Sequence, residues 1–173
     1  RVFIELLDEM YPGTKDLSLV ASKRSAGKSM FCGKQEFIIQ DIEEFDFSQV
    51  EIAFFSAGAE TAEKYAPIAV SKGCTVIDNS SQFRTDLDKP LIVPEVNSKD
   101  LKNFKLPGII ANPNCSTAQL VVALKPIHDL FKIERVDVAS YQSVSGTGKE
   151  GIDELLEQTE SFLNKKEIKP RVY

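Results

Sequence analysis

Cys115 is the residue of this chain whose type and setting best suit covalent chemistry. An apolar strand-like run, residues 109–111, stops at an Asn-Pro-Asn corner, residues 112–114, and an apolar run with helical spacing, residues 117–131, follows the cysteine. A helix beginning there places the sulfur at its N-terminal edge, where unpaired backbone N–H groups and the helix dipole favour a thiolate. The corner adds two asparagine amides around the sulfur and a rigid proline. We therefore predict that Cys115 is a nucleophile.

The other two cysteines, Cys32 and Cys74, are expected to be small buried residues, which is also the alternative for Cys115. Three is an odd number, and the positions do not match the spacing of a metal site. Unpaired thiols favour a reducing compartment. We expect no metal site and a cytoplasmic location.

Arg24 and Ser25 follow an apolar run, residues 17–21, within the stretch VASKRSAGKS. An arginine and a serine after the second strand of a dinucleotide-binding fold suit a ribose with a 2′-phosphate, because the guanidinium group matches phosphate geometry. The pair predicts NADP as the cofactor. A solvated basic turn fits this segment, taken alone, about equally well.

Two other run ends carry residues that suit ligand binding. The run 52–55 is followed by three small residues, Ser56, Ala57 and Gly58. Small residues allow a backbone to lie close to a ligand. A polar end, residues 78–81, precedes the permanent cation of Arg84, and this combination suits an anion site. The alternatives are an ordinary tight turn for the first end and a polar surface turn for the second.

Strand-like and helical runs alternate along the chain. Apolar, β-branched runs predict strands at residues 17–21, 36–39, 52–55, 75–77, 109–111 and 135–141. Helical spacing predicts a helix already under way at Arg1 and others at residues 61–72, 98–104, 117–131 and 150–164. The alternation predicts an α/β fold with a Rossmann-like, mostly parallel sheet and helices on both faces. Chemistry then gathers at the carboxyl ends of the strands.

Composition and charge exclude several classes of function. A chain of 173 residues with 42% hydrophobic content can bury a sizeable core. The net charge of −5, with charges dispersed along the sequence, leaves no basic stripe for nucleic acid and no polybasic patch for a membrane surface. No apolar run approaches the roughly 20 residues of a membrane-spanning helix. We expect small-molecule partners, with neither nucleic acid nor membrane.

Several stretches, taken together, resemble the aspartate-β-semialdehyde dehydrogenase family. NPNCST and SYQSVSGTGKE carry the resemblance, and ASKRSAGK, FFSAGAETAEKYAPIAV, IDNSSQFR and PLIVPEVN support it in the family's order. Glyceraldehyde-phosphate dehydrogenases and N-acetylglutamyl-phosphate reductases have different residues around the cysteine. The resemblance covers nearly the whole chain.

The resemblance implies an oxidoreductase of lysine, threonine and methionine biosynthesis that converts L-aspartyl 4-phosphate to L-aspartate 4-semialdehyde and phosphate with NADPH. Cys115 would form a thioester with the substrate, and Gln142 matches the family's substrate-positioning glutamine. The other matched residues would bind phosphate (Arg84 and Asn114), the cofactor's 2′-phosphate (Arg24 and Ser25) or the nicotinamide side of the cofactor (Ser145 and Gly146).

The chain also departs from the family pattern. Its only histidine, His128, lies thirteen residues beyond Cys115 in the same predicted helix, roughly 20 Å away at the α-helical rise, and is expected to be structural. The family's catalytic histidine belongs to a later segment and its glycine fingerprint to an earlier one. We therefore expect a chain truncated at both ends and inactive alone, from a protein that is a homodimer when complete.

Two domains are expected on the same basis. Residues 1–111 would form the NADP-binding Rossmann-like domain without its first strand and glycine loop. Residues 112–173 would begin an α+β catalytic and dimerisation domain.

Two rival interpretations use the same fold. A cysteine-dependent acyltransferase or hydrolase could use Cys115, but it needs a nearby histidine, which this chain does not supply. A non-catalytic paralogue typically loses the nucleophile, so the presence of both Cys115 and Gln142 argues against it.

Overall fold

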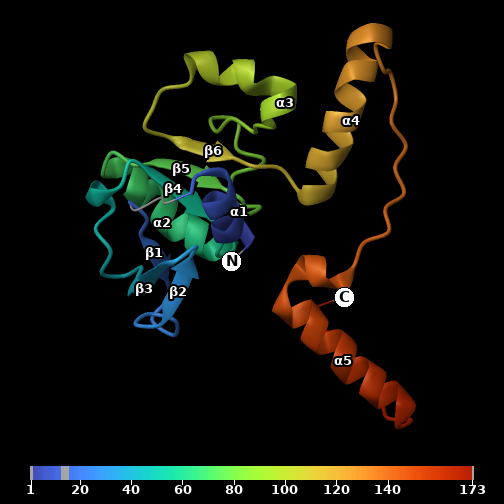
Figure 1. The fold of residues 1–173 in the computed structure, drawn as a ribbon. Coiled ribbons are helices and arrows are strands. Elements are labelled where there is room, and N and C mark those ends of the chain that lie inside the picture. Colours follow the sequence, from blue (N-terminus) through green and yellow to red (C-terminus); the bar gives the residue numbers. More distant parts are fainter. Residues whose placement is uncertain (1, 13–15, 173) are drawn as a thin grey trace. The chain divides into compact units, whose positions relative to one another are not determined.

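The computed structural model describes residues 2–12 and 16–172. The chain forms two compact units, one extending to Lys132 and the other beginning at Ile133 (Figure 1). A helix already under way at Arg1 was predicted, but Arg1 itself is outside the described residues. The helix that follows, α1 (Val2–Met10), is present where helical spacing predicts it.

A parallel sheet forms the centre of the first unit. Its strands lie in the order β4 (Ile52–Phe55), β5 (Thr75–Asp78) and β6 (Ile109–Ala111), and all are parallel. Helix α2 (Ala59–Ser71) connects β4 to β5 and packs on one face of this sheet. The carboxyl ends of the three strands therefore share one edge, as the sequence predicts.

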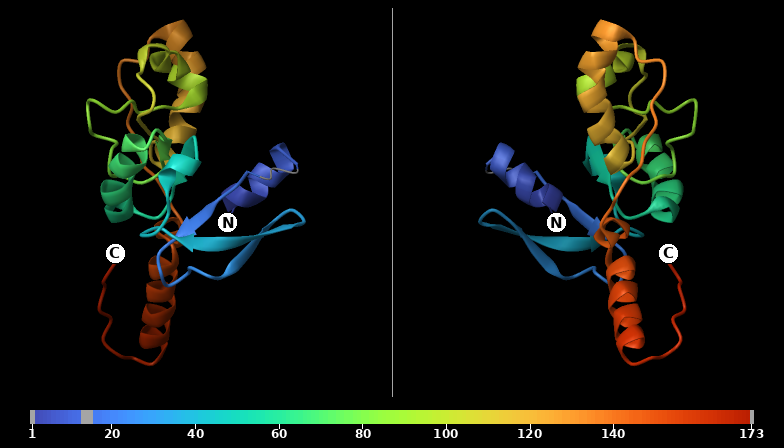
Figure 2. Two further views of the ribbon diagram at one scale, coloured as in Figure 1. Left: turned by 90° about the vertical axis from the view of Figure 1, so that its left-hand side faces the viewer. Right: turned by 90° about the vertical axis from the view of Figure 1, so that its right-hand side faces the viewer.

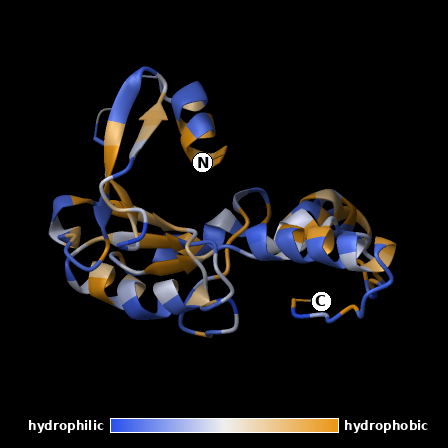
Figure 3. Ribbon diagram, turned by 90° about the horizontal axis from the view of Figure 1, so that it is seen from below, coloured by the Kyte–Doolittle hydropathy of each residue, from blue (hydrophilic) through white to orange (hydrophobic). Residues whose placement is uncertain are grey.

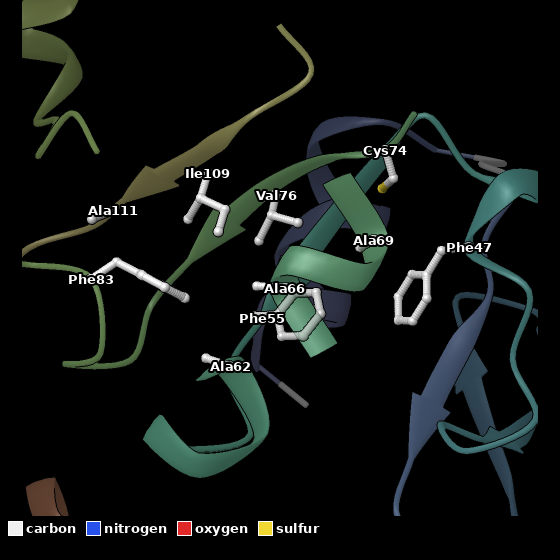
Figure 4. Close-up of a cluster of buried hydrophobic side chains, with 10 residues drawn as sticks. All are labelled: Phe47, Phe55, Ala62, Ala66, Ala69, Cys74, Val76, Phe83, Ile109 and Ala111. Atoms are coloured by element: carbon white, nitrogen blue, oxygen red, sulfur yellow. The ribbon is translucent and has the colours of Figure 1, made fainter. Parts of the chain in front are cut away.

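The core lies between α2 and this sheet (Figure 4). Alanines at 62, 66 and 69 recur along one side of α2 and are buried, so the helix backbone approaches the strands closely. Val76, in the central strand, is fully buried beneath them. The other buried members of the cluster are Phe47, Phe55, Cys74, Phe83, Ile109 and Ala111.

The opposite side of β4 is covered in part by α1. Phe55 faces the core, and its neighbour Phe54 points the other way, as successive residues of a strand must. The Phe54 ring stacks on Phe3 of α1 with the ring centroids 4.2 Å apart and the planes within 4°. The expected α/β fold, with helices on both faces of a mostly parallel sheet, is confirmed.

A second three-stranded sheet has the strand order β1 (Leu19–Ala21), β3 (Gln35–Asp41), β2 (Ser29–Cys32). Strand β1 is parallel to β3, and β2 pairs antiparallel to β3 in a hairpin that lies beside α1 (Figure 2). The sequence predicts one sheet. The described strands instead form two sheets, because β1 and β4 are not paired with each other. Strand β2 was not predicted, because its four residues are too few to give a clear periodic signal.

Short helical turns complete the first unit. One, η1 (Phe47–Gln49), precedes β4, and two, α3 (Pro94–Asn97) and η2 (Ser98–Asn103), lie between β5 and β6. The helix expected at residues 98–104 is therefore a 3-10 helix preceded by one α-helical turn. Helix α4 (Cys115–Phe131) follows β6 directly after the Asn-Pro-Asn corner.

The second unit contains η3 (Val144–Thr147) and α5 (Lys149–Leu163). The buried Glu154 carboxylate accepts hydrogen bonds from the backbone N–H groups of Arg171 and Val172, which ties the segment after α5 back onto that helix. The strand expected at residues 135–141 is not formed. Alternating valines give it a strand-like pattern, but the described residues offer no neighbouring strand to take its backbone hydrogen bonds.

Helices α4 and α5 carry hydrophobic residues along their lengths (Figure 3), and several of these side chains remain exposed. The most exposed of these include Leu130, Phe131, Leu156, Phe162 and Leu163. None of the helices in the described ranges is long and apolar enough to cross a membrane.

Candidate active site

Cys115 is the first residue of α4 and its side chain is exposed. The preceding residue, Asn114, caps the helix: its side-chain oxygen accepts a hydrogen bond from the Ser116 N–H at 2.9 Å. The Cys115 Sγ lies 4.0 Å from the same oxygen. The sequence predicts a helix from residue 117, so the prediction that it begins beside the cysteine is confirmed to within two residues.

A ring of hydrogen bonds holds the corner that leads to Cys115. The Arg84 guanidinium donates from Nε to the Asn112 carbonyl at 2.9 Å and from Nη2 to the Asn79 carbonyl at 3.0 Å. The Asn112 side-chain Nδ2 donates to Asn79 Oδ1 at 2.6 Å. Arg84 therefore lies beside the Asn-Pro-Asn corner. The Asn112 amide, expected near the sulfur, is instead directed to Asn79.

Asp78, at the end of β5, organises the turn that carries Asn79. Its carboxylate is fully buried and accepts hydrogen bonds from the Ser80 N–H at 3.0 Å and the Ser80 hydroxyl at 2.7 Å. Its backbone carbonyl accepts from the Asn112 N–H at 2.8 Å, which extends the β5–β6 pairing by one residue. A buried carboxylate without partners would be costly, and these bonds satisfy it.

Arg24 and Ser25 lie in the turn after β1. The Arg24 side chain is exposed, and the Ser25 N–H donates to the Ser22 carbonyl at 2.8 Å to close the turn. Gly27 completes the turn with a φ of 80°, a value that favours glycine. The guanidinium is thus presented to solvent at the carboxyl end of a parallel strand.

Gly58 is the N-cap residue of α2, and no atom crowds its backbone where a side chain would lie. Its φ of 91° and ψ of 168° lie in a region that is essentially restricted to glycine. A Cβ at this position would meet nothing within 4 Å, and Ser56 and Ala57 before it are exposed. Helix α2 therefore begins directly after three small residues and without a side-chain cap, an arrangement that suits an anionic ligand.

Gln142, Ser145 and Gly146 lie together in the second unit. The Gln142 amide nitrogen packs so close to the Cα of Gly146 that any side chain there would collide with it. Ser145 shares a 2.8 Å hydrogen bond with the Ser143 hydroxyl, and Ser143 caps η3. Gln142 was expected at a strand end, but the residues before it form no strand.

His128 is exposed near the C-terminal end of α4, and one continuous helix separates it from Cys115. The sequence predicts that His128 lies in the same helix as Cys115 and far along it, and the structure agrees. Among the described residues, no group of three or more His, Cys, Asp or Glu side chains could hold a metal ion.

The three thiols have different surroundings. Cys32 and Cys74 are buried, as predicted, and Cys115 is exposed. Burial raises the pKa of the Cys74 thiol, because the charged form is disfavoured away from water. Cys115 is therefore the thiol that a substrate can reach.

Sequence reasoning missed the pairing of Asn79 with Asn112. The two side chains come from segments 33 residues apart, and local patterns carry no information about such a contact. The signal that could have found it is topological: both residues directly follow neighbouring parallel strands, whose last residues, Asp78 and Ala111, are paired.

Two family models match the chain. Residues 1–104 match the NAD-binding domain of semialdehyde dehydrogenases, and residues 124–173 match the dimerisation domain of semialdehyde dehydrogenases.

Individual relatives and solved structures are also similar. The aspartate-semialdehyde dehydrogenase of Shewanella sp. is 51% identical over 174 residues, covering 100% of this chain and 51% of the relative. The crystal structure of aspartate semialdehyde dehydrogenase II from Vibrio cholerae, complexed with ASA, matches with a TM-score of 0.89 at 50% identity, over 99% of this chain and 51% of that one. The Candida albicans enzyme with NADP matches with a TM-score of 0.63 at 30% identity, over 76% and 44%. The chain spans about half the length of the curated relatives it matches.

Proposed function

The chain belongs to the semialdehyde dehydrogenase family, and on that premise we propose that it is part of an aspartate-semialdehyde dehydrogenase. The complete protein would convert L-aspartyl 4-phosphate to L-aspartate 4-semialdehyde and phosphate in amino-acid biosynthesis. The similar proteins of Shewanella and Vibrio cholerae support this substrate. The residues described here would supply the nucleophile and much of the cofactor site.

Cys115 is the proposed nucleophile. Its thiolate would attack the acyl carbon of the aspartyl phosphate, forming a carbon–sulfur bond as the carbon–oxygen bond to phosphate breaks. The product is a thioester, which divides one difficult displacement into two easier steps. The observation that carries the proposal is the exposed sulfur on the first residue of α4, directly after a corner bound by Arg84.

Arg84 and Asn114 are proposed to bind the phosphate group. Two N–H groups of Arg84 already donate to backbone carbonyls, and its positive charge remains beside the corner to attract an anion. Gln142 is proposed to orient the substrate carbonyl, where amide donors stabilise the negative charge that develops on oxygen.

The cofactor site proposed here takes NADP. When bound, NADPH supplies the hydride that reduces the thioester. The exposed Arg24 with Ser25 would hold the 2′-phosphate, and the open backbone at Ser56, Ala57 and Gly58 suits the approach of another part of the dinucleotide. Ser145 and Gly146 would lie on the nicotinamide side. The similarity to an enzyme with bound NADP supports this choice of cofactor.

The domain division proposed from the sequence, residues 1–111 and 112–173, places Cys115 in the catalytic domain. The complete protein is proposed to be a cytoplasmic homodimer. The family model for a dimerisation domain, which begins at residue 124, and the exposed apolar residues of α4 and α5 support a dimer. Three free cysteines support a reducing compartment.

Activity of the complete protein in the reverse direction tests the proposal. Aspartate semialdehyde, phosphate and NADP are supplied, and NADPH formation is followed by absorbance. The proposal predicts phosphate-dependent turnover that Cys115→Ser abolishes and that Cys32→Ser, a change at a buried cysteine, leaves within about twofold. Phosphate-independent acyl transfer supports a cysteine acyltransferase, and no turnover supports a non-catalytic paralogue.

A further inference from the structure

Asn79 and Asn112 occupy equivalent positions at one edge of the parallel sheet. Each is the first residue after its strand, and the last residues of those strands, Asp78 and Ala111, are register partners. The Asn79 N–H donates to the Phe55 carbonyl at 2.8 Å, so Asn79 is fixed to the end of β4 as well. Asn79 is thereby held at the carboxyl end of the parallel sheet.

The contacts between these residues form a closed ring with Arg84. Asn112 donates through its side chain to Asn79 Oδ1, and Arg84 bridges the main-chain carbonyls of both asparagines. The Asn79 side chain therefore controls which way the Asn112 amide turns. Arg84 fixes the direction in which the chain leaves β6.

The ring lies three residues before Cys115. Between them are Pro113, which is buried and whose ring fixes one backbone torsion, and Asn114, which caps α4. A displacement at Asn112 is therefore transmitted through a short, stiff link to the start of α4 and to the sulfur. The Asn79 side chain is exposed, so its bond adds little to the packed core.

We propose that Asn79 is a positioning residue for Cys115, acting through the Asn112 side chain and the corner that Arg84 holds. The inference rests on the proposed function for its catalytic consequence. The hydrogen bonds of Asn79 go to Phe55, Arg84 and Asn112, none of which is assigned to the cofactor, so its effect should fall on the rate of the chemical step.

The test compares Asn79→Ala, Asn112→Ala and the double variant in the complete protein. Each single change is expected to lower kcat by about 10- to 100-fold with KM for aspartate semialdehyde within about twofold, because a small misplacement of a reacting group has an effect of this size. The double variant should be no worse than either single one, because both remove the same contact. Asn103→Ala, a change at an exposed asparagine elsewhere in the first unit, is the control and should retain wild-type kcat.

Asn79→Asp separates positioning from general destabilisation. Its carboxylate keeps the acceptor oxygen for Asn112, so kcat should recover to within about threefold of wild type. KM for phosphate should rise, because a negative charge next to Arg84 opposes phosphate binding. Loss of kcat equal to that of Asn79→Ala would overturn the inference.

Alkylation of Cys115 by iodoacetamide, followed by peptide mass spectrometry, gives a readout that does not need the enzymatic activity. Asn79→Ala should change the alkylation rate at least threefold, because the start of α4 and the sulfur that it carries are displaced from their wild-type position. Wild-type alkylation rates in that variant overturn the inference. A changed rate in a protein with no dehydrogenase activity would refute the proposed function and leave the positioning role standing.

Discussion

The Arg84 guanidinium donates from Nε to the main-chain carbonyl of Asn112 at 2.9 Å, across 28 residues of sequence. This bond connects the polar turn after β5 to the corner that precedes Cys115. A single arginine therefore has two tasks in our account: it holds the corner through two carbonyls and offers its charge to phosphate.

Replacing Arg84 should separate these two tasks. Arg84→Lys keeps a positive charge but cannot reproduce the planar fork that bridges two carbonyls. We expect kcat to fall by about tenfold or more in Arg84→Lys, while Arg84→Ala also raises KM for phosphate by at least tenfold. Steady-state kinetics of the complete protein measures both. An Arg84→Lys variant with wild-type kcat would show that the fork has no positioning role.

Gly58→Ala tests whether the dinucleotide approaches the start of α2. The change should lower the free energy of unfolding by about 1–3 kcal/mol, because φ at this position is 91°. It should also raise KM for NADP. Gly73→Ala is the matched control: Gly73 has a φ of 93°, also with nothing near a built Cβ, but follows the opposite end of α2. It should cost similar stability and leave KM for NADP unchanged. Equal KM values in the two variants would remove Gly58 from the cofactor site.

Gly146→Ala should act through Gln142. A methyl group at residue 146 collides with the Gln142 amide, so the amide must move. We expect kcat to fall about 10- to 100-fold, as in Gln142→Ala, with urea-induced unfolding little changed, since Gly146 is exposed. In a Gln142→Ala background the second change should have almost no further effect. Additive losses would mean that Gly146 is required for another reason.

Cys74 should make stability depend on alkaline pH. Burial raises the pKa of the folded thiol above the ordinary 9.0, so the unfolded chain releases its proton first as pH rises. The contribution is complete below that ordinary value and is lost as pH climbs toward the folded pKa. Urea unfolding of wild type and Cys74→Ala at about pH 7 and pH 10 should show a steeper decline in wild type. Parallel declines would contradict the shift.

The core should respond strongly to small cavities. Val76→Ala removes two methyl groups from a fully buried position and should lower the free energy of unfolding by about 2 kcal/mol. Val122, which is 40% exposed on α4, is the control, and Val122→Ala should cost well below half of that. Urea denaturation measures both free energies of unfolding. Equal losses in the two variants would contradict the assignment of Val76 to the core.

Local patterns predicted the elements whose signals are self-contained. The parallel strand at residues 109–111 and the helix after Cys115 follow directly from an apolar run, an Asn-Pro-Asn corner and a second apolar run. Two strand assignments failed in opposite ways. Ser29–Cys32 forms a strand because Gln35–Asp41 folds back beside it, whereas residues 135–141 have the pattern but no partner among the described residues.

The candidate site was predictable in its residue types but not in its contacts. The chemistry of Cys115 and Arg84 is implied by residue type and by position after a strand or before a helix. The partners of Arg84, Asn79 and Asn112 depend on how neighbouring strands align, which the register of β5 and β6 decides.

The most direct test of the account is to trap the acyl group on the nucleophile. The complete protein is mixed with aspartate semialdehyde and NADP in the absence of phosphate, quenched in acid and digested for peptide mass spectrometry. We predict a burst of NADPH of about one equivalent per subunit, with an aspartyl group attached to the peptide containing Cys115. An aspartyl group on a different residue, or an undiminished burst in Cys115→Ser, would contradict the assignment of Cys115 as the nucleophile.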